Sequence, residues 1–249
     1  MTGGCAPGRG LQSRLAATFG LALAIAGCAA RDSLDNMAKT DPLEPLNRVF
    51  YKVNDVGDHY VLRPIAKGYV KATPRLLRTG AGHFFDNVGY PVVIVNDFLQ
   101  GKLRQGGADS ARFLLNSTVG VLGIFDPATE IGLTQHDEDL GQTLAVWGAP
   151  AGPFLMIPLI GPRTTTHLIG SLGDSYVSPL VNYHDSYVRW DLLIFQTIHR
   201  RSTLLQVDEE IRKAFDPYVF IRDAYLQNRA YLIYDGRVPE DELRPPDEE

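Results

Sequence analysis

The sequence predicts a mostly α-helical protein. Apolar residues recur at spacings of three and four over much of the chain, helix-start signals precede several of these segments, and few stretches show the alternation of a strand. The exception is the β-branched run Pro91–Val95, which favours a strand. No internal repeat is visible. About 220 residues after the N-terminal segment are enough for one large domain or two small ones.

The first predicted helix starts at Asp41–Glu44. An aspartate cap, a proline at the first position and a glutamate three residues on form a helix-start signature. Pro45 leaves the exact boundary open. Apolar residues then follow at helical spacing, at Leu43, Leu46, Phe50 and Val53.

Two later helices are predicted to begin after Thr73-Pro74 and after Asp216-Pro217. Between them, two sets of apolar residues have helical spacing: Tyr187, Trp190, Ile194 and Ile198, then Leu204, Val207, Ile211 and Phe215. The phase changes at Arg200-Arg201. This pattern fits either one long bent helix or two consecutive helices.

The segment Leu140–Pro162 carries no charged side chain over 23 residues. It is long enough to cross a bilayer, but its prolines and glycines would break a continuous helix. Three interpretations are open: a buried core segment, a membrane-lying loop or hairpin, or a spanning helix. If it faces lipid, its backbone amides must be paired within the protein.

The N-terminus has the pattern of a lipoprotein signal peptide, predicted at residues 1–27. Arg9 and Arg14 supply a positive region, Leu15–Ala26 is apolar, and small residues precede Cys28. We expect cleavage before Cys28, acylation of that cysteine and a lipidated tether at residues 28–40, with stable anchoring by several acyl chains. The alternative is an ordinary signal peptide with a chance cysteine. Ala29, in place of aspartate, favours the outer membrane.

Charge and cysteine content exclude several classes of function. Removal of the signal peptide leaves 22 of the 24 basic residues against 29 acidic ones, which argues against a nucleic-acid partner. Of the two cysteines, Cys5 leaves with the signal and Cys28 is acylated, so no disulfide is expected. The acidic, proline-rich residues 237–249 predict a disordered tail after a folded domain at 41–236.

No motif for catalysis, metal binding or a cofactor is found. The chain has no G-x-S-x-G elbow, no H-E-x-x-H and no P-loop. His136–Asp139 offers possible metal ligands, but four adjacent side chains point in different directions. We therefore expect no enzymatic activity, no metal and no cofactor.

Five motifs in series resemble the MlaA family of outer-membrane lipoproteins, also called VacJ. They are DPLEPLNRVFYKVND, VLRPIAKGY, FLQGKLRQGGADSARFLLNSTVGVLGIFDPA, DEDLGQTLAVWGAPAGPFLMIPLIGPRTTTH and FDPYVFIRDAYLQNR. The likeness covers about residues 41 to 235, nearly the whole chain after the signal peptide and tether.

The resemblance implies an all-α, ring-shaped single domain of amphipathic helices lying in the inner leaflet of the outer membrane. An amphipathic channel through the ring would pass phospholipids mislocalised to the outer leaflet to a periplasmic carrier of the MlaC type, which maintains lipid asymmetry. The family also associates with trimeric porins and has no known covalent chemistry. Two alternatives are a structural lipoprotein that braces a porin complex without lipid transport, and a lipid-modifying enzyme.

The resemblance also implies site residues. Leu46 and Asn47 match the family's N-terminal helix motif and are the gating candidates, although Pro45-Leu46 stands where glycine and an aromatic residue are usual. Arg63, Arg112 and Arg163 lie in matched motifs and could contact head-group phosphates. The alternative for each arginine is a structural cation, and for Leu46 and Asn47 simple packing of the helix.

Overall fold

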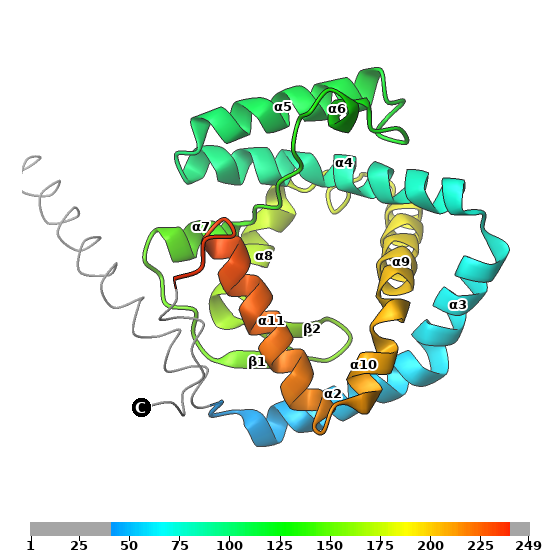
Figure 1. Cartoon of the computed structure of the whole chain (residues 1–249), viewed down its shortest axis with the longest axis vertical. Helices are drawn as coiled ribbons and strands as arrows, with labels where there is room; N and C mark the ends of the chain where they lie inside the picture. The colour runs from blue at the N-terminus through cyan, green and yellow to red at the C-terminus, as the bar shows by residue number, and fades with distance from the viewer. Residues whose placement is uncertain (1–40, 240–249) are drawn as a thin grey trace, which may run out of the picture.

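The computed structural model describes residues 41–239 (Figure 1). The predicted signal peptide and tether, with Cys28, lie outside the described residues, as do positions 240–249 of the predicted tail. In chain order the elements are α2 (Glu44–Gly57), the π-helix η1 (Asp58–Leu62), α3 (Arg63–Ala72), α4 (Arg75–Leu99), α5 (Leu103–Thr118), α6 (Pro127–Glu130), α7 (Leu140–Val146), β1 (Phe154–Ile157), β2 (Gly161–Thr164), α8 (Thr165–Val177), α9 (Ser186–Thr203), the 3-10 helix η2 (Leu204–Gln206), α10 (Asp208–Lys213) and α11 (Pro217–Ile233). The expected helical class is confirmed, with one short β-hairpin as the exception.

The helices are arranged around a centre (Figure 1). In this view α4 runs along the top with α5 beside it, α3 descends one side, and α2 lies along the bottom. The hairpin, α7 and α8 close the other side, while α9 and α11 run between top and bottom. Contacts of α2 with β1, of α3 with α9 and of α11 with α7 connect these parts into one body.

The predicted starts of α4 and α11 are confirmed. Pro74 occupies the N-cap of α4, and the Asp216 carboxylate accepts hydrogen bonds from the Tyr218 and Val219 amides at the start of α11. The predicted Asp41 cap is wrong, because α2 starts at Glu44 with Pro45 in its first turn, where a missing N–H costs nothing. Asp41 instead accepts hydrogen bonds from the Leu43 amide and the Asn47 side chain.

The predicted strand at Pro91–Val95 is also wrong, since these residues lie in the middle of α4. Tyr90, Val93 and Asp97 are buried at spacings of three and four, which is the period of a helix face. The proline removes one helical hydrogen bond, and the continuing helix on both sides overrides the strand preference of the β-branched run. Farther on, the first apolar set lies in α9, while the second is divided, with Leu204 in η2, Ile211 in the short α10, and Val207 and Phe215 outside these elements.

The uncharged segment Leu140–Pro162 forms α7, a loop and the hairpin. The spanning-helix alternative is wrong, because the segment is divided among these three structures. No helix in the described part of the chain is long and apolar enough to cross a membrane. Gly148 and Gly152 adopt positive φ of 92° and 68° between α7 and β1, which a continuous helix cannot accommodate. In the hairpin Phe154 pairs with Thr164 and Ile157 with Gly161, while Leu159 at the tip is 90% exposed.

The interior of the protein is unusually polar. Fourteen polar or charged residues are buried against ten apolar ones, and the apolar core around Phe154, Met156 and Tyr218 is small. Helix α2 shows the arrangement clearly, because its apolar stripe is about half exposed at every position: Leu46, Val49, Val53 and Val56. Its other face carries Asn47 and Asn54, which bind the hairpin. An apolar face of this kind marks contact with lipid or another protein.

Candidate functional site

Two cavities lie within the ring. The polar cavity, of about 450 Å³, is lined by α4, residues 135–139, β2, α8 and α9. The apolar cavity, of about 250 Å³, lies between α2, η1, the hairpin, α10 and α11. Its apolar wall is formed by Tyr51, Met156, Leu204, Val207, Ile211 and Ile221.

Consecutive residues line the two cavities. Pro162 of β2 lines the apolar cavity and Arg163 the polar one, while on α9 Arg201 lines the apolar cavity and Arg200 the polar one. Successive side chains of a strand point to opposite faces, so the two cavities lie on the two sides of β2 and near the last turn of α9. This places a polar compartment next to an apolar one inside the ring.

Arg163 lies where the cavities adjoin. One guanidinium nitrogen, Nη1, donates to the Pro162 carbonyl at 2.8 Å, and no carboxylate within residues 41–239 forms an ion pair with it. Burial lowers the pKa of Arg163, and the nearby positive charges of Arg229 and Arg200 lower it further. Arg163 is therefore a half-buried cation that forms no ion pair within these residues.

The wall between α7, α8 and α11 is held by paired polar groups. Burial alone would raise the pKa of Asp139, but hydrogen bonds from Arg229 at 2.5 and 2.7 Å hold it at about 2. His167 stacks on Tyr225, and its Nδ1 lies 2.9 Å from the tyrosine hydroxyl. Burial, helped by Arg229, lowers the pKa of His167 to about 4, so its ring is neutral at pH 7.

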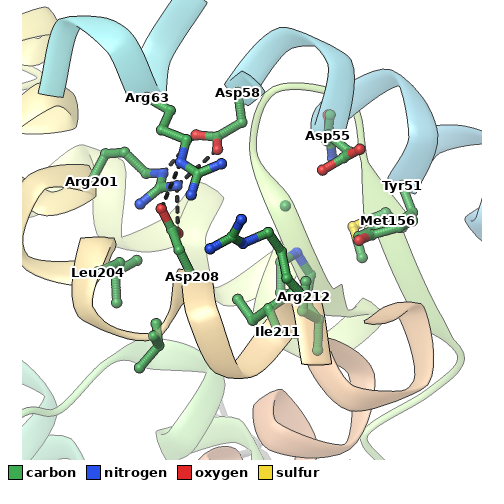
Figure 2. Close-up of a pocket in the computed structure, with 15 residues that line it drawn as sticks. Tyr51, Asp55, Asp58, Arg63, Met156, Arg201, Leu204, Asp208, Ile211 and Arg212 are labelled. Carbon is green, nitrogen blue, oxygen red and sulfur yellow. Dashed lines mark hydrogen bonds and ion pairs between the residues drawn. The ribbon is translucent and has the colours of Figure 1, made fainter. Parts of the chain in front are cut away.

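A four-membered ion network closes one side of the apolar cavity. Figure 2 shows Arg63 and Arg201 between Asp58 and Asp208. Arg63 Nε lies 2.8 Å from Asp208, while Arg201 makes two hydrogen bonds to Asp58, at 2.6 and 2.8 Å, and one to Asp208, at 2.7 Å. The network joins the π-helix η1, a type of distortion often found at functional sites, to the ends of α9 and α10. Arg63 thus lies at this cavity with its charge compensated.

Leu46 and Asn47 point to different sides of α2. Leu46 is 48% exposed on the outer face. Asn47 is buried: its Nδ2 donates to the Phe154 carbonyl at 2.9 Å and its Oδ1 accepts from the Met156 amide at 2.9 Å. Asn47 therefore holds the edge of β1 as a third strand would.

Arg112 lies apart from both cavities and is 2% exposed. It pairs with Asp126 at 2.5 Å, donates to the Leu133 carbonyl at 2.6 Å and lies over the Tyr90 ring. These contacts are those of a structural cation. Of the three predicted arginines, the structure brings Arg63 and Arg163 to adjoining cavities and leaves Arg112 in the packing between α5 and α6.

Sequence reasoning missed Arg200 and, apart from Asn47, the inner face of α2. Asn47, Tyr51, Asp55 and Asp58 follow one another at spacings of four, four and three, which is a polar helical stripe opposite the apolar one and was the available signal. The four residues of His136–Asp139 have separate surroundings: His136 binds Asp109, Glu138 binds Lys102, and Asp139 binds Arg229.

The described residues define an amphipathic, mostly helical fold, with an exposed apolar stripe on α2, a polar interior and one cavity of each kind. The sequence profile of the MlaA lipoprotein family matches residues 39–232, and the chain belongs to that family. It is 32% identical over 230 residues to the intermembrane phospholipid transport system lipoprotein MlaA of Escherichia coli, covering 89% of this chain and 87% of the relative.

Two further relatives agree. The protein of the same description from Haemophilus influenzae is 30% identical over 234 residues, covering 91% of this chain and 93% of the relative. A solved structure published as "Structural basis for maintenance of bacterial outer membrane lipid asymmetry" is similar with a TM-score of 0.70 and 30% identity. It covers 78% of this chain and 99% of its own.

Proposed function

We propose that this protein is the outer-membrane lipoprotein of an intermembrane phospholipid transport system. It takes phospholipids mislocalised to the outer leaflet through its ring and passes them to a soluble periplasmic carrier of the MlaC type, which maintains lipid asymmetry. The descriptions of the relatives from E. coli and H. influenzae support the class of cargo. The chemistry is binding and release, with no covalent step.

The observation that carries this proposal is the polar cavity adjoining the apolar one. A phospholipid has a charged head and apolar tails, so a passage for it needs a polar wall and an apolar wall that are no farther apart than the length of the lipid. Arg163 and Arg200 offer guanidinium groups to the phosphate. Met156, Leu204 and Val207 offer apolar surface to an acyl chain.

The outer surface supports placement within the membrane. The exposed stripe of α2 and the hairpin tip at Leu159 are apolar surfaces that the fold leaves uncovered. We place these helices in the inner leaflet of the outer membrane, with the acylated Cys28 as anchor on the periplasmic side. A trimeric porin is the proposed neighbour in the membrane.

Asn47 is the proposed gating residue, acting through the hairpin. Its side chain fixes β1 against α2, and Met156 of β1 lines the apolar cavity. Release of these hydrogen bonds would let the hairpin shift and alter the width of that cavity. Leu46, on the outer face of α2, would contact the surrounding lipid. Arg63 would hold the start of α3 in place through its ion pair with Asp208.

Lipid transfer from proteoliposomes tests the proposal. Purified lipidated protein, alone or with a trimeric porin, would be reconstituted with labelled phospholipid, and label would be measured in a MlaC-type carrier. We expect transfer that depends on the protein and falls about tenfold in Arg163→Gln, the loss of one charge-assisted contact. Arg104→Gln is the matched control, because Arg104 is exposed on α5 and lines neither cavity.

Other outcomes would identify the alternatives. Porin binding without any movement of lipid would indicate a structural lipoprotein. Hydrolysed lipid would indicate an enzyme. Equal transfer by both arginine variants would remove Arg163 from the passage while leaving transport itself in place.

A further inference from the structure

Charged groups of the polar cavity fall into two sets. In the first set each group has a partner. His136 pairs with Asp109, Glu138 with Lys102 and Asp139 with Arg229. The Asp174 carboxylate accepts hydrogen bonds from the Leu140 amide and the Asn96 side chain. In contrast, Arg163, Arg200, Asp86 and Asp137 form no ion pair with any residue in the described range 41–239. Two cations and two anions without an ion pair in this range therefore line the polar cavity. Asp86, Asp137 and Arg200 are exposed, and Asp86 and Arg200 also line a second pocket that contains Arg75 and Arg78.

The unpaired groups come from different sides of the cavity. Arg163 lies on β2, Arg200 on α9, Asp86 on α4 and Asp137 in the segment before α7. Arg163 and Arg200 line the same cavity, and burial, followed by the charges of Arg229 and Arg200, lowers the pKa of Arg163. A bound anion between the two guanidiniums would relieve this repulsion.

Asp137 has the opposite requirement. Its surface is exposed, yet burial raises its pKa, with the charge of Asp139 adding to the rise and Arg200 acting against it. Both observations hold together if the exposed surface faces the cavity inside the ring. Asp137 and Arg200 therefore interact across a gap without touching, and a cation placed beside Asp137 would stabilise its charged form.

We propose that the polar cavity recognises zwitterionic phospholipid head groups, with the phosphate between Arg163 and Arg200 and the amine at Asp137 and Asp86. This inference rests on the proposed function and adds the head-group class to it. An anionic head group, such as phosphoglycerol, satisfies the arginines but leaves both carboxylates without a partner. The cavity volume of about 450 Å³ is within the usual range for small-molecule sites.

The experiment measures which lipid the protein retains. Lipidated protein would be equilibrated with vesicles containing equal amounts of phosphatidylethanolamine and phosphatidylglycerol, reisolated, and its bound lipid measured by mass spectrometry. We expect phosphatidylethanolamine to be enriched about tenfold, the value of one charge-assisted hydrogen bond. Asp137→Asn should reduce the enrichment to about twofold or less, and Asp86→Asn should reduce it in part.

Asp191→Asn is the matched control, because Asp191 is an exposed carboxylate on α9 that lines neither cavity. Equal retention of the two lipids by the unaltered protein would overturn the inference, as would a selectivity that survives both Asp137→Asn and Asp86→Asn. Selective retention of lipid without transfer to the carrier would contradict the proposed transport but not the head-group selectivity. Transfer without head-group selectivity would count against this inference alone.

Discussion

Replacing Asp97 by asparagine should stabilise the protein at alkaline pH and change it little in acid. Asp97 of α4 and Asp109 of α5 are both fully buried. Asp97 accepts a hydrogen bond from Gln105 at 2.8 Å and Asp109 binds His136 at 2.8 Å, but within the described chain the second oxygen of each carboxylate has no hydrogen-bond partner. Burial beside a second carboxylate makes Asp97 retain its proton more easily than an isolated aspartate does.

The magnitude follows from the pKa of Asp97. Burial raises it from 3.8 to about 7, and the negative charges of Asp109 and Glu138 add to the effect. Between these values the native state holds a proton that the unfolded state has lost, so the free energy of unfolding falls as pH rises, by about 1.4 kcal/mol per unit. The loss is complete above pH 7 and amounts to at most about 4 kcal/mol.

Asparagine cannot ionise, and its amide can donate to the free oxygen of Asp109. We therefore expect Asp97→Asn to exceed the original protein in stability by about 1 kcal/mol or less at pH 4.5 and by about 2–4 kcal/mol at pH 8. Urea unfolding of the detergent-solubilised protein, followed by circular dichroism across this range, measures the difference. Asp55→Asn, at an exposed carboxylate of α2, should show no such widening.

The reasoning is refuted if Asp97→Asn is no more stable than the original protein at pH 8. It also fails if the gap between the two proteins stays constant from pH 4.5 to pH 8. Titrating groups that do not interact with Asp97 change the stability of both proteins alike, so the difference between the two proteins reports Asp97 together with the neighbouring Asp109 and Glu138.

Three further predictions concern anchoring and folding. Cys28→Ser should leave the protein soluble or unprocessed, and its normal recovery in a membrane fraction would contradict acylation at Cys28. Asn47→Ala should cost about 1–3 kcal/mol in urea unfolding, because it leaves two backbone groups of β1 unpaired, whereas Asn54→Ala near the exposed tip should cost less. Arg112→Glu should lower the free energy of unfolding by about 3–5 kcal/mol and prevent accumulation of the protein, because it leaves a buried charge unpaired. Arg104→Glu on the surface should change the free energy of unfolding by no more than about 0.5 kcal/mol.

The fold was predictable where local chemistry decides it. Capping aspartates and prolines fix helix starts through atoms a few residues apart, as at Asp216-Pro217. The error at Pro91–Val95 arose because a short β-branched run was weighed without the helix that continues on both sides of it. Apolar spacing identified Leu46 and Val53 of the α2 stripe, but Phe50, predicted with them, packs against the core, because periodicity alone does not say whether a position faces a core or the surroundings.

The candidate site was predictable only in part. Arg163 was found through resemblance to a family, since nothing in its local sequence marks it. Arg200 and Asp137 were missed as a pair, because they are more than sixty positions apart in the sequence. Only the fold brings α9 and the segment before α7 to the same cavity. Arg112 shows the opposite case, in which a matched motif contains a residue that serves packing.

The outward-facing apolar stripe of α2 has a consequence for biogenesis. An exported chain with this surface must cross an aqueous compartment before it reaches its membrane. In water the exposed apolar stripe promotes self-association of the chain. Under the proposed export and acylation at Cys28, delivery requires a companion protein that covers both the acyl chains and this face of α2 until lipid replaces it. A copy that loses this companion should be removed as an aggregate rather than persist as a free protein.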